Sequence, residues 1–432
     1  MARFLIAGTP VPGHIAPLLA VARHLHGRGH EVVLYTASVF RDQVQAAGAH
    51  FVSFPAEIDL DYRRLDEHFP ERAALPPGPA QLIFGLKHLF ADAMPQQCHG
   101  IREILAWFPA EAIIIDTMFC GVMPLVLAGR HRRPPVVSLG ITALAWSSED
   151  TAFFGTALPP PTTPPARARA TAMTRYMQQN FYGEVQSYFD AILAKQGLPA
   201  LPNFLFNSFI TMPDVYLQLT AKGFEYPRRD LPNTVRFVGP LLPPPSTRFD
   251  PPEWWDDLDG DRPVVLVTQG TLANTDLGQL VGPTLTALAR DDVLVVATTG
   301  GPPVEAIPVP LPANARAGVF VPFDRLLPKV DLMVTNGGYG AVNHALSLGV
   351  PLVVAGDSEE KPEIAARVAW AGAGINLETG RPSPEHIQDA VQAVLADPCY
   401  RKAARDLQAE FARYHALEDI TAVVEGFIGA TA

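Results

Sequence analysis

Short apolar runs and helix-like segments alternate along the first 55 residues. Residues 3–8 (RFLIAG), 31–36 (EVVLYT) and 50–55 (HFVSFP) are strand-like. Between them lie residues 16–30 (APLLAVARHLHGRGH), in which apolar positions have helical spacing, and a shorter helical segment that ends at residues 46–49 (AAGA). Strands that alternate with helices form parallel sheets, so this pattern predicts a βαβαβ unit.

The same alternation returns after residue 263. Strand-like runs occur at residues 263–271 (PVVLVTQGT), 293–300 (VLVVATTG), 317–322 (AGVFVP), 331–336 (DLMVTN), 350–356 (VPLVVAG) and 373–377 (AGINL). The proline-rich, acidic segment Val238–Pro263 indicates a linker. We therefore predict an α/β protein with two Rossmann-like domains, residues 1–237 and 264–412, and ligands at the carboxyl ends of the strands. Residues 413–432 are expected to form a helix that returns to the first domain.

Two regions interrupt the alternation. Residues 56–100 and 141–200 are rich in proline and aromatic residues, and Leu158–Ala170 (LPPPTTPPARARA) has a low-complexity composition that predicts a mobile loop. These regions are interpreted either as simple insertions or as a pocket for an acceptor substrate. In the second interpretation aromatic side chains line the pocket, and the candidates are Phe84, Phe90, Trp146, Phe153 and Phe154.

The segment Ala112–Gly129 (AIIIDTMFCGVMPLVLAG) approaches the length of a membrane span. It contains Asp116 and Pro124, and its β-branched residues lie at its front. Parallel strands that are buried on both faces have continuous apolar runs of this kind. We therefore interpret the segment as a buried strand followed by a helix, and we expect no stable insertion into a membrane.

Composition narrows the functional classes. The chain of 432 residues is 48% hydrophobic and 18% charged, which is typical of well-packed soluble domains. Its net charge of −11 argues against nucleic acid as the main partner. The three cysteines are widely spaced and form neither a disulfide framework nor a metal-binding motif. Together with the lack of a secretion-signal pattern at the start, this favours a cytoplasmic protein.

The most informative short motif is VTNGGYGAVNHAL, at Val334–Leu346. A strand-like segment ends at Asn336, three of the next four residues are glycines, and a helical pattern then begins. Glycines let a ligand approach the backbone, and the N-terminus of a helix offers N–H groups and a positive dipole end to a phosphate. Such turns also occur for packing alone, so this motif by itself leaves both interpretations open.

Longer stretches around the motif resemble a known family. Leu326–Val368 resembles the nucleotide-sugar signature of the UDP-glycosyltransferase-like superfamily (glycosyltransferase family 1), which has the GT-B fold. Gly8–Thr36 is similar to the N-terminal signature of the same family, especially in its bacterial macrolide-glycosyltransferase-like branch. The resemblance covers both domains and is weakest over residues 56–100 and 141–200. It implies two Rossmann-like domains whose parallel sheets face each other across an interdomain cleft.

The resemblance also implies roles for individual residues. His14 matches the catalytic base, and Asp116 matches the acid that orients this base. The positions that match donor-binding residues are Thr271 near the diphosphate, Phe320 near the nucleobase with Val321 beside it in sequence, Asn336, Gly337, Gly338, Tyr339 and Gly340 in the phosphate turn, His344 at the ribose, and Glu360 and Lys361 at the donor sugar.

Five positions depart from the usual pattern of the family. Asn336, Tyr339, Ala341, His344 and Phe323 stand where histidine, tryptophan, serine, glutamate and glutamine are usual. These departures bear on the identity of the base and the sugar rather than on the fold. At the ribose, Asn343 is an alternative partner that could replace the missing glutamate.

The chemistry of His14 and Asp116 fits the roles that the resemblance implies. His14 begins an apolar helix, whose positive end favours a neutral imidazole. A neutral imidazole accepts a proton, and a carboxylate at its other nitrogen fixes the tautomer. Asp116 ends a strand of the same predicted sheet. Without the family signatures, helix capping would be the simpler interpretation of both residues.

Two Asp-Leu-Asp sequences, at residues 59–61 and 257–259, have a spacing that can hold a divalent metal under a diphosphate. Neither follows a convincing buried strand, so both are interpreted as solvated surface. The cluster of His24, His26 and His30 is poorly spaced for a closed metal site. We expect no metal and no cofactor apart from the nucleotide-sugar co-substrate.

The resemblance to the family, supported by these residues, implies an inverting, metal-independent hexosyltransferase of bacterial natural-product or antibiotic biosynthesis. Its donor is a TDP- or UDP-sugar, and its acceptor is a hydroxyl of a lipophilic small molecule such as a macrolide, polyketide or polyphenol. The alternatives are a GT-B sugar-nucleotide epimerase and a non-catalytic nucleotide-sugar-binding helper protein. A nicotinamide oxidoreductase is disfavoured, because no GxGxxG motif follows the first strand. The oligomeric state stays open between a monomer and a homodimer.

Overall fold

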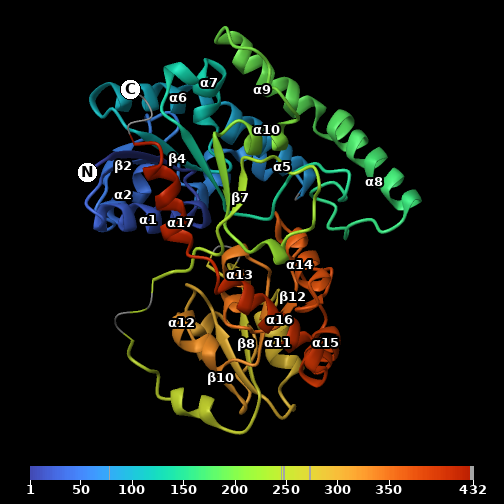
Figure 1. Ribbon diagram of the computed structural model, residues 1–432. Coiled ribbons are helices and arrows are strands. Elements are labelled where there is room, and N and C mark those ends of the chain that lie inside the picture. Colours follow the sequence, from blue (N-terminus) through green and yellow to red (C-terminus); the bar gives the residue numbers. More distant parts are fainter. Residues whose placement is uncertain (77, 245, 247–248, 272–273, 429–432) are drawn as a thin grey trace.

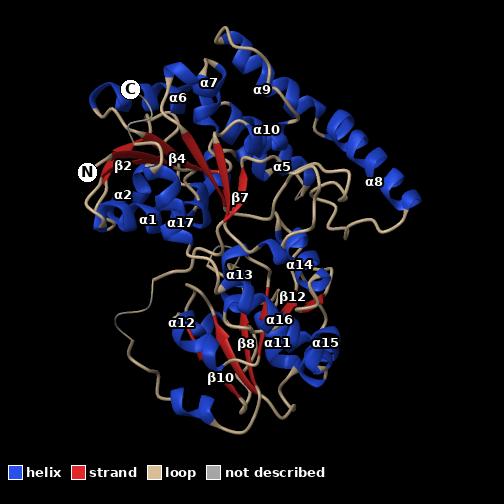
Figure 2. Ribbon diagram, in the orientation of Figure 1, coloured by secondary structure: helices blue, strands red, loops and turns tan. Residues whose placement is uncertain are grey.

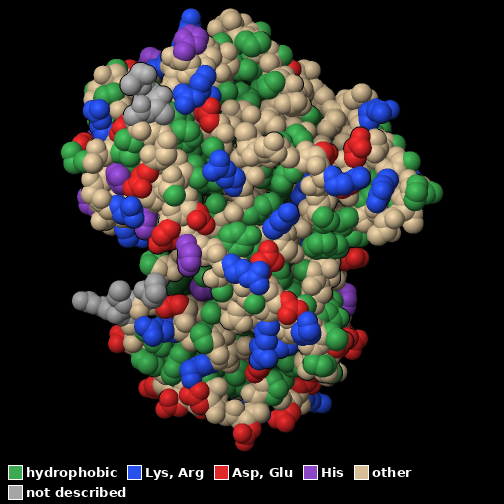
Figure 3. Space-filling view, in the orientation of Figure 1, with side chains coloured by type: hydrophobic (Ala, Val, Ile, Leu, Met, Phe, Trp, Pro, Cys, Tyr) green, Lys and Arg blue, Asp and Glu red, His purple; other side chains and the backbone are tan. Residues whose placement is uncertain are grey.

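Each half of the chain forms a parallel β-sheet covered by helices, and the two halves make two lobes that meet at a narrow waist (Figure 1, Figure 2 and Figure 3). The computed structural model describes residues 1–76, 78–244, 246, 249–271 and 274–428. Acidic and basic side chains are mixed over the face of both lobes that Figure 3 shows. Within the described residues, no helix combines the length and the apolar character that crossing a membrane requires.

The first lobe is built on a sheet whose described part has seven strands in the order β3-β2-β1-β4-β5-β6-β7, all parallel. The strands are β1 (Arg3–Ala7), β2 (Glu31–Thr36), β3 (His50–Ser53), β4 (Ala112–Asp116), β5 (Val136–Gly140), β6 (Val215–Gln218) and β7 (Val235–Phe237). The strand order reverses between β1 and β4. Open parallel sheets bind ligands at such a switch point, outside the carboxyl ends of the strands.

The sheet of the second lobe has the same design, and its described part has six parallel strands in the order β10-β9-β8-β11-β12-β13. They are β8 (Val264–Thr268), β9 (Leu294–Thr298), β10 (Ala315–Gly318), β11 (Leu332–Thr335), β12 (Leu352–Val354) and β13 (Gly374–Asn376). The order reverses between β8 and β11. Each lobe therefore has one switch point at which a ligand can be held.

The helices lie on both faces of the two sheets (Figure 2). In the first lobe they are α1 (Pro12–Gly27), α2 (Arg41–Ala46), α3 (Leu65–His68), α4 (Pro70–Ala73), α5 (Pro79–Gly85), α6 (Met94–Trp107), α7 (Met123–Leu127), α8 (Pro164–Tyr176), α9 (Gly183–Lys195) and α10 (Leu205–Thr211). The later helices are α11 (Val281–Ala287), α12 (Phe323–Leu326), α13 (Tyr339–Ser347), α14 (Lys361–Trp370), α15 (Pro384–Ala396), α16 (Pro398–Phe411) and α17 (Ala416–Glu425).

Burial on both faces explains the continuous apolar runs of the strands. All residues of β4, β5 and β8 are buried. The segment Ala112–Gly129 divides into strand β4 and the short helix α7. The interpretation of this segment as a strand followed by a helix is therefore confirmed.

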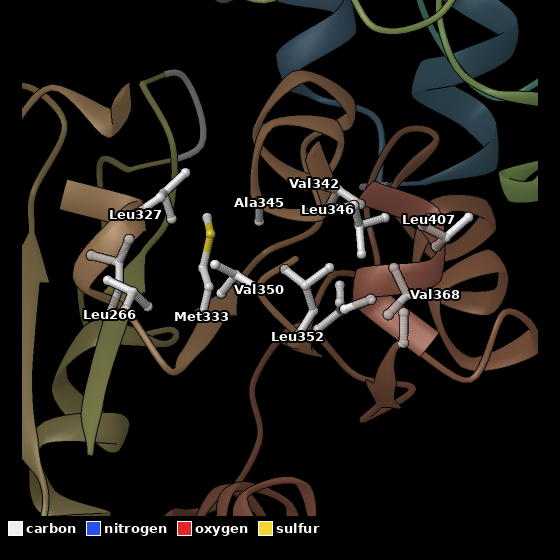
Figure 4. Close-up of a cluster of buried hydrophobic side chains, with 14 of the residues drawn as sticks. Leu266, Leu327, Met333, Val342, Ala345, Leu346, Val350, Leu352, Val368 and Leu407 are labelled. Carbon is white, nitrogen blue, oxygen red and sulfur yellow. The ribbon is translucent and has the colours of Figure 1, made fainter. Parts of the chain in front are cut away.

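One of the two large apolar clusters of the second lobe lies between its sheet and helices α13, α14 and α16, and the other packs against α11 and α15. Figure 4 shows part of the first cluster, including Leu266, Met333, Val342, Leu346, Leu352, Val368 and Leu407. Ala143, Ala221 and Phe224 of the first lobe belong to the same cluster. The two lobes therefore share a buried apolar contact, and burial of this surface favours one arrangement of the lobes.

The chain crosses between the lobes twice. The first crossing follows β7, and its aromatic residues Phe249, Trp254 and Trp255 pack against the core of the second lobe. The second crossing follows α16 and leads to α17, which lies beside α1 (Figure 1). Ile420 and Val424 of α17 are buried in the core of the first sheet. A helix that follows the second lobe in sequence thus completes the first lobe in space.

Two local features differ from the sequence prediction. A mobile loop is expected over Leu158–Ala170, but α8 begins at Pro164, and the hydroxyl of Thr163 accepts the N–H of Ala166 at 3.3 Å. Prolines at the first positions of a helix are pre-organised for its start, so the loop prediction is wrong for this part. The strand predicted at residues 317–322 also lies earlier in the chain, since β10 spans Ala315–Gly318.

Candidate active site

The ends of β1 and β4 bring His14 and Asp116 together at the first switch point. His14 lies in the first turn of α1, and Asp116 is the last residue of β4. Gly8 permits the close approach of the chain to α1, because a Cβ at this position would lie 2.7 Å from Cδ1 of Ile15. The Nδ1 atom of His14 lies 2.8 Å from Oδ1 of Asp116.

Donors surround the buried carboxylate of Asp116. Thr9 donates its backbone N–H to Oδ2 at 2.7 Å and its hydroxyl to Oδ1 at 3.1 Å, and the N–H of Met118 donates to Oδ1 at 3.0 Å. Hydrogen bonds of this kind offset the cost of burying a carboxylate. Thr9 was not among the candidates from the sequence. Its position after β1, at the same edge of the sheet as Asp116, is the signal that could have identified it.

The contact with Asp116 sets the tautomer of His14. A carboxylate only accepts hydrogen bonds, so Nδ1 of the imidazole carries the proton and Nε2 is left as an acceptor. The side chain of His14 is 21% exposed, whereas that of Asp116 is fully buried. The pair can therefore take a proton from a hydroxyl at Nε2, and Asp116 can stabilise the imidazolium that forms.

The glycine turn lies at the second switch point, between β11 and α13. Gly337 has a φ of +88°, and a Cβ there would lie 2.9 Å from Cγ1 of Val354 in β12, so this position requires glycine. Asn336 donates its side-chain amide to the backbone carbonyl of Gln269 at 2.6 Å. This hydrogen bond ties the turn to the end of β8.

The start of α13 is open to a ligand. Gly338 precedes the helix, and among the described residues outside the adjoining chain and the turns of α13 itself no heavy atom lies within 4 Å of a Cβ added at Gly338 or Gly340. The N–H groups of the first turn of a helix have no partner within the helix. The turn therefore presents hydrogen-bond donors and the positive end of a helix dipole to an anion.

A hollow lies beside the glycine turn. Its lining includes Gln269, Gln279, Asn336, Gly356, Asp357, Ser358 and Lys361. The buried ammonium group of Lys361 contacts Glu359 and, at 3.2 Å, the hydroxyl of Ser358. Burial and the neighbouring Glu359 raise the pKa of the Glu360 carboxyl, and the adjacent ammonium group of Lys361 opposes this shift.

The remaining donor candidates fall into exposed and buried groups. Thr271 is exposed and Phe320 is 72% exposed, so both side chains are accessible to a ligand. Val321 and Tyr339 are buried. The hydroxyl of Tyr339 accepts a hydrogen bond of 2.7 Å from Nε2 of Gln218 in β6. The side chain of Tyr339 thus joins the two lobes instead of facing the hollow.

His344 and Asn343 point in different directions from α13. The ring of His344 is buried with its centroid 5.8 Å from that of Phe323. Burial lowers the pKa of His344, so its imidazole is neutral at pH 7. Asn343 accepts the hydroxyl hydrogen of Thr220 at 2.6 Å and donates to the carbonyl of Tyr339 at 2.9 Å. Asn343 is therefore engaged at the contact between the lobes.

The five aromatic acceptor candidates do not form one wall. Phe90 and Phe153 belong to the cluster around α9 and α10, in which Phe153 is only 1% exposed. Phe154 packs against the core of the second lobe, and Trp146 packs against a separate small cluster. Phe84 makes ring contacts within the inserted region 56–100. The structure thus disperses these residues, and it places Phe153 in a core instead of on a pocket surface.

The acidic Asp-Leu-Asp sequences have protein partners. Asp59 accepts the N–H of Ser38 at 2.7 Å, and Asp257 pairs with Arg316 at 2.6 Å. Within the described residues, no group of three or more His, Cys, Asp and Glu side chains is arranged to hold a metal ion.

Comparison with known proteins extends over the whole chain. Residues 283–425 match the family described as Erythromycin biosynthesis protein CIII-like, C-terminal domain, and residues 4–122 match the Glycosyltransferase family 28 N-terminal domain. The 4′-demethylrebeccamycin synthase of Lentzea aerocolonigenes is 41% identical over 427 residues, which cover 99% of this chain and 100% of that protein. UDP-glycosyltransferase 2 of Phaeomoniella chlamydospora is 37% identical over 428 residues, which cover 96% of this chain and 93% of that protein.

A solved structure of the spinosyn rhamnosyltransferase SpnG, complexed with thymidine diphosphate, shares the fold. Its TM-score is 0.69 at 20% identity, and the match covers 98% of this chain and 100% of that one. Together, the two lobes and the relatives define a glycosyltransferase with the GT-B fold. More narrowly, the chain belongs to the UDP-glycosyltransferase-like superfamily. The resemblance and the fold class predicted from the sequence are therefore confirmed.

Proposed function

We propose that the protein is an inverting, metal-independent glycosyltransferase that uses a TDP- or UDP-sugar and a hydroxyl group of a lipophilic small molecule. The observation that carries this proposal is the His14–Asp116 pair. The pair lies at the switch point of the first sheet, and the contact with Asp116 leaves Nε2 of the imidazole as an acceptor for a proton. The relative named 4′-demethylrebeccamycin synthase supports a natural-product acceptor.

The reaction follows from this placement. The Nε2 atom of His14 takes the proton of the acceptor hydroxyl while the hydroxyl oxygen bonds to the anomeric carbon. The bond between this carbon and the diphosphate oxygen breaks on the opposite face, so the configuration inverts. The N–H groups at the start of α13 stabilise the negative charge of the departing diphosphate. Glu360 and Lys361 hold hydroxyls of the sugar.

Mass spectrometry tests the proposal directly. The protein is incubated with TDP-glucose or UDP-glucose and the polyphenol quercetin, and the product is examined for the mass increment of one hexose. The coupling constant of the anomeric proton in the product then reports whether the configuration is inverted. An isomerised donor without a glycosylated product would indicate an epimerase instead, and binding without turnover would indicate a helper protein.

Activity is expected to survive an excess of EDTA. The diphosphate meets backbone N–H groups and a helix dipole at residues 337–340, which bind an anion without a divalent ion. The measurement compares initial rates before and after chelation, with dialysed protein as the control. Loss of activity that Mn²⁺ or Mg²⁺ restores would contradict this account of the leaving group.

TDP-glucose is expected to be used at least as well as UDP-glucose. A glutamate at position 344 would accept hydrogen bonds from both ribose hydroxyls, and hydrogen bonds to charged groups contribute roughly 1.5–3 kcal/mol. The neutral ring of His344 accepts at one nitrogen only, so the 2′-hydroxyl that distinguishes UDP from TDP contributes less. The comparison of kcat/KM for the two donors holds the sugar constant.

The variant His344→Glu supplies the matched control, because it should shift the preference toward UDP-glucose. Asn343 is held between Thr220 and Tyr339, which disfavours it as a substitute for the glutamate. A preference of the unchanged protein for UDP-glucose above about tenfold, roughly 1.4 kcal/mol, would reject the prediction.

A further inference from the structure

One carboxylate of the second lobe reaches into the first lobe. Glu363 lies in the first turn of α14, and its Oε1 accepts hydrogen bonds from the backbone N–H groups of Gly155 and Ala157, both at 2.7 Å. Its Oε2 accepts a hydrogen bond of 2.8 Å from Nη1 of Arg367. Both oxygens of this buried carboxylate are therefore engaged.

The loop that Glu363 contacts has an unfavourable backbone conformation. Gly155 has a φ of +102°, and Ala157 has a φ of +54°. The left-handed region is disfavoured for alanine because its Cβ approaches the following carbonyl oxygen. Residues stay in such conformations only where the surrounding contacts fix them. The two N–H groups that converge on Oε1 of Glu363 supply such a contact.

A buried cluster of charges holds Glu363 in place. Arg367 lies between Glu363 and Glu225 of the first lobe, and its Nε donates to Oε2 of Glu225 at 3.0 Å. Arg228 donates to the same oxygen at 3.2 Å. The side chains of Arg367 and Glu225 are each 1% exposed. Because two acids and two arginines are paired away from water, Glu363 has a fixed position, unlike a mobile surface residue.

The loop and the helix belong to opposite sides of the proposed reaction. The loop lies between β5 and α8, in the lobe that carries His14. Phe153 of the loop is buried in the core of that lobe, whereas Phe154 packs against the core of the second lobe. Helix α14 begins at Lys361, directly after Glu360, so its start carries the two donor-sugar positions. Glu363 thus joins the acceptor side to the donor side.

We propose that Glu363 is a positioning residue that holds the loop at residues 153–157 against α14 and thereby sets where the acceptor lies relative to the donor sugar. This inference rests on the proposed function. Glu363 acts through the loop, so its removal should weaken acceptor binding while the donor, which meets the second lobe, binds as before. A residue that only stabilised the fold would not separate the two substrates in this way.

Amide hydrogen exchange tests the hold on the loop and needs no catalytic activity. In Glu363→Ala, exchange at the amides of Gly155 and Ala157 should be at least about tenfold faster than in the unchanged protein. Glu410→Ala is the matched control, since Glu410 of α16 also accepts a backbone N–H of the first lobe, that of Gly223 at 2.9 Å. This control should leave both amides unchanged. Unaltered exchange in Glu363→Ala would overturn the proposal.

Steady-state kinetics with TDP-glucose and quercetin tests the consequence. In Glu363→Ala, KM for quercetin should rise about tenfold or more, and KM for TDP-glucose should stay within about threefold. Glu363→Gln keeps an oxygen that can accept a hydrogen bond, so its KM for quercetin should lie between those of the unchanged protein and Glu363→Ala. This variant keeps the test decisive if Glu363→Ala folds poorly. Equal changes in both KM values, or an unchanged KM for quercetin beside fast loop exchange, would reject the positioning role. If the unchanged protein transfers no glucose, the proposed function fails, and the exchange result still decides whether Glu363 holds the loop.

Discussion

Replacing His14 with alanine is expected to lower kcat at least about 100-fold, the usual contribution of a general base. In the proposed reaction the imidazole nitrogen of His14 takes the acceptor proton, whereas the second lobe binds the diphosphate. The affinity for TDP should therefore change little. Asp116→Asn should show the same pattern in a milder form, because the imidazole remains but loses its 2.8 Å contact with a charged oxygen. Turnover at saturating substrates and calorimetric titration with TDP measure the two quantities.

His99→Ala provides the control for this substitution. His99 lies on α6 with a side chain that is 69% exposed, and it pairs with Glu103 at 3.2 Å, on the surface of the first lobe. This variant should keep full activity. A His14→Ala protein that glycosylates a hydroxyl acceptor at the normal rate would disprove the role of His14 as the base.

The second large effect is expected on stability, where Arg367→Met should lower the free energy of unfolding by about 3–5 kcal/mol. The substitution leaves the buried Glu225 paired with Arg228 and removes the arginine that pairs with the buried Glu363. Removing one member of a buried charge cluster is strongly destabilising, because it leaves the opposite charges buried without a partner that offsets the cost of removing them from water. Urea unfolding at pH 7 measures the difference between the two proteins.

The pH dependence distinguishes a charge effect from a packing effect. Burial raises the pKa of Glu225, but Arg367 and Arg228 outweigh burial, so the pKa is lowered in the folded protein. The stabilisation from ionised Glu225 is present above the ordinary glutamate pKa and is lost as the pH falls through the folded value. The difference in the free energy of unfolding between the unchanged protein and Arg367→Met should therefore become smaller at acid pH. Arg381→Met, which removes an exposed pair with Asp276, should cost below about 1 kcal/mol, and an equal cost for the two substitutions would contradict the role of the cluster.

The fold could be predicted from the sequence because its strands are parallel and buried on both faces. Continuous apolar runs such as those of β4 and β8 are a direct result of that burial. The ends of the strands and helices could be predicted less well from the sequence. The apolar pattern continues past β10 to Val321, because Val321 is buried by packing outside the sheet. The proline-rich segment before α8 shows that composition alone does not separate a loop from the start of a helix.

The site could be predicted only in part. The juxtaposition of His14 and Asp116 follows from two neighbouring strands that end at the same edge of a sheet. The partners of Tyr339 and Glu363 depend on how two lobes meet, which no local pattern specifies. The same reason explains the dispersed acceptor candidates. Their aromatic composition predicted burial, but it could not assign each ring to one of several clusters.

The return of α17 to the first lobe has a consequence for the construction of hybrid enzymes. A chimera cut once, within the linker Val238–Pro263, would combine the first lobe of one parent with the α17 of the other. The positions of Ile420 and Val424 would then present foreign side chains to the core around α1. Cavities or overpacking at such positions cost about 1–5 kcal/mol. A hybrid that exchanges the second lobe of this protein therefore needs two junctions, one in each crossing, so that the first lobe keeps its own last helix.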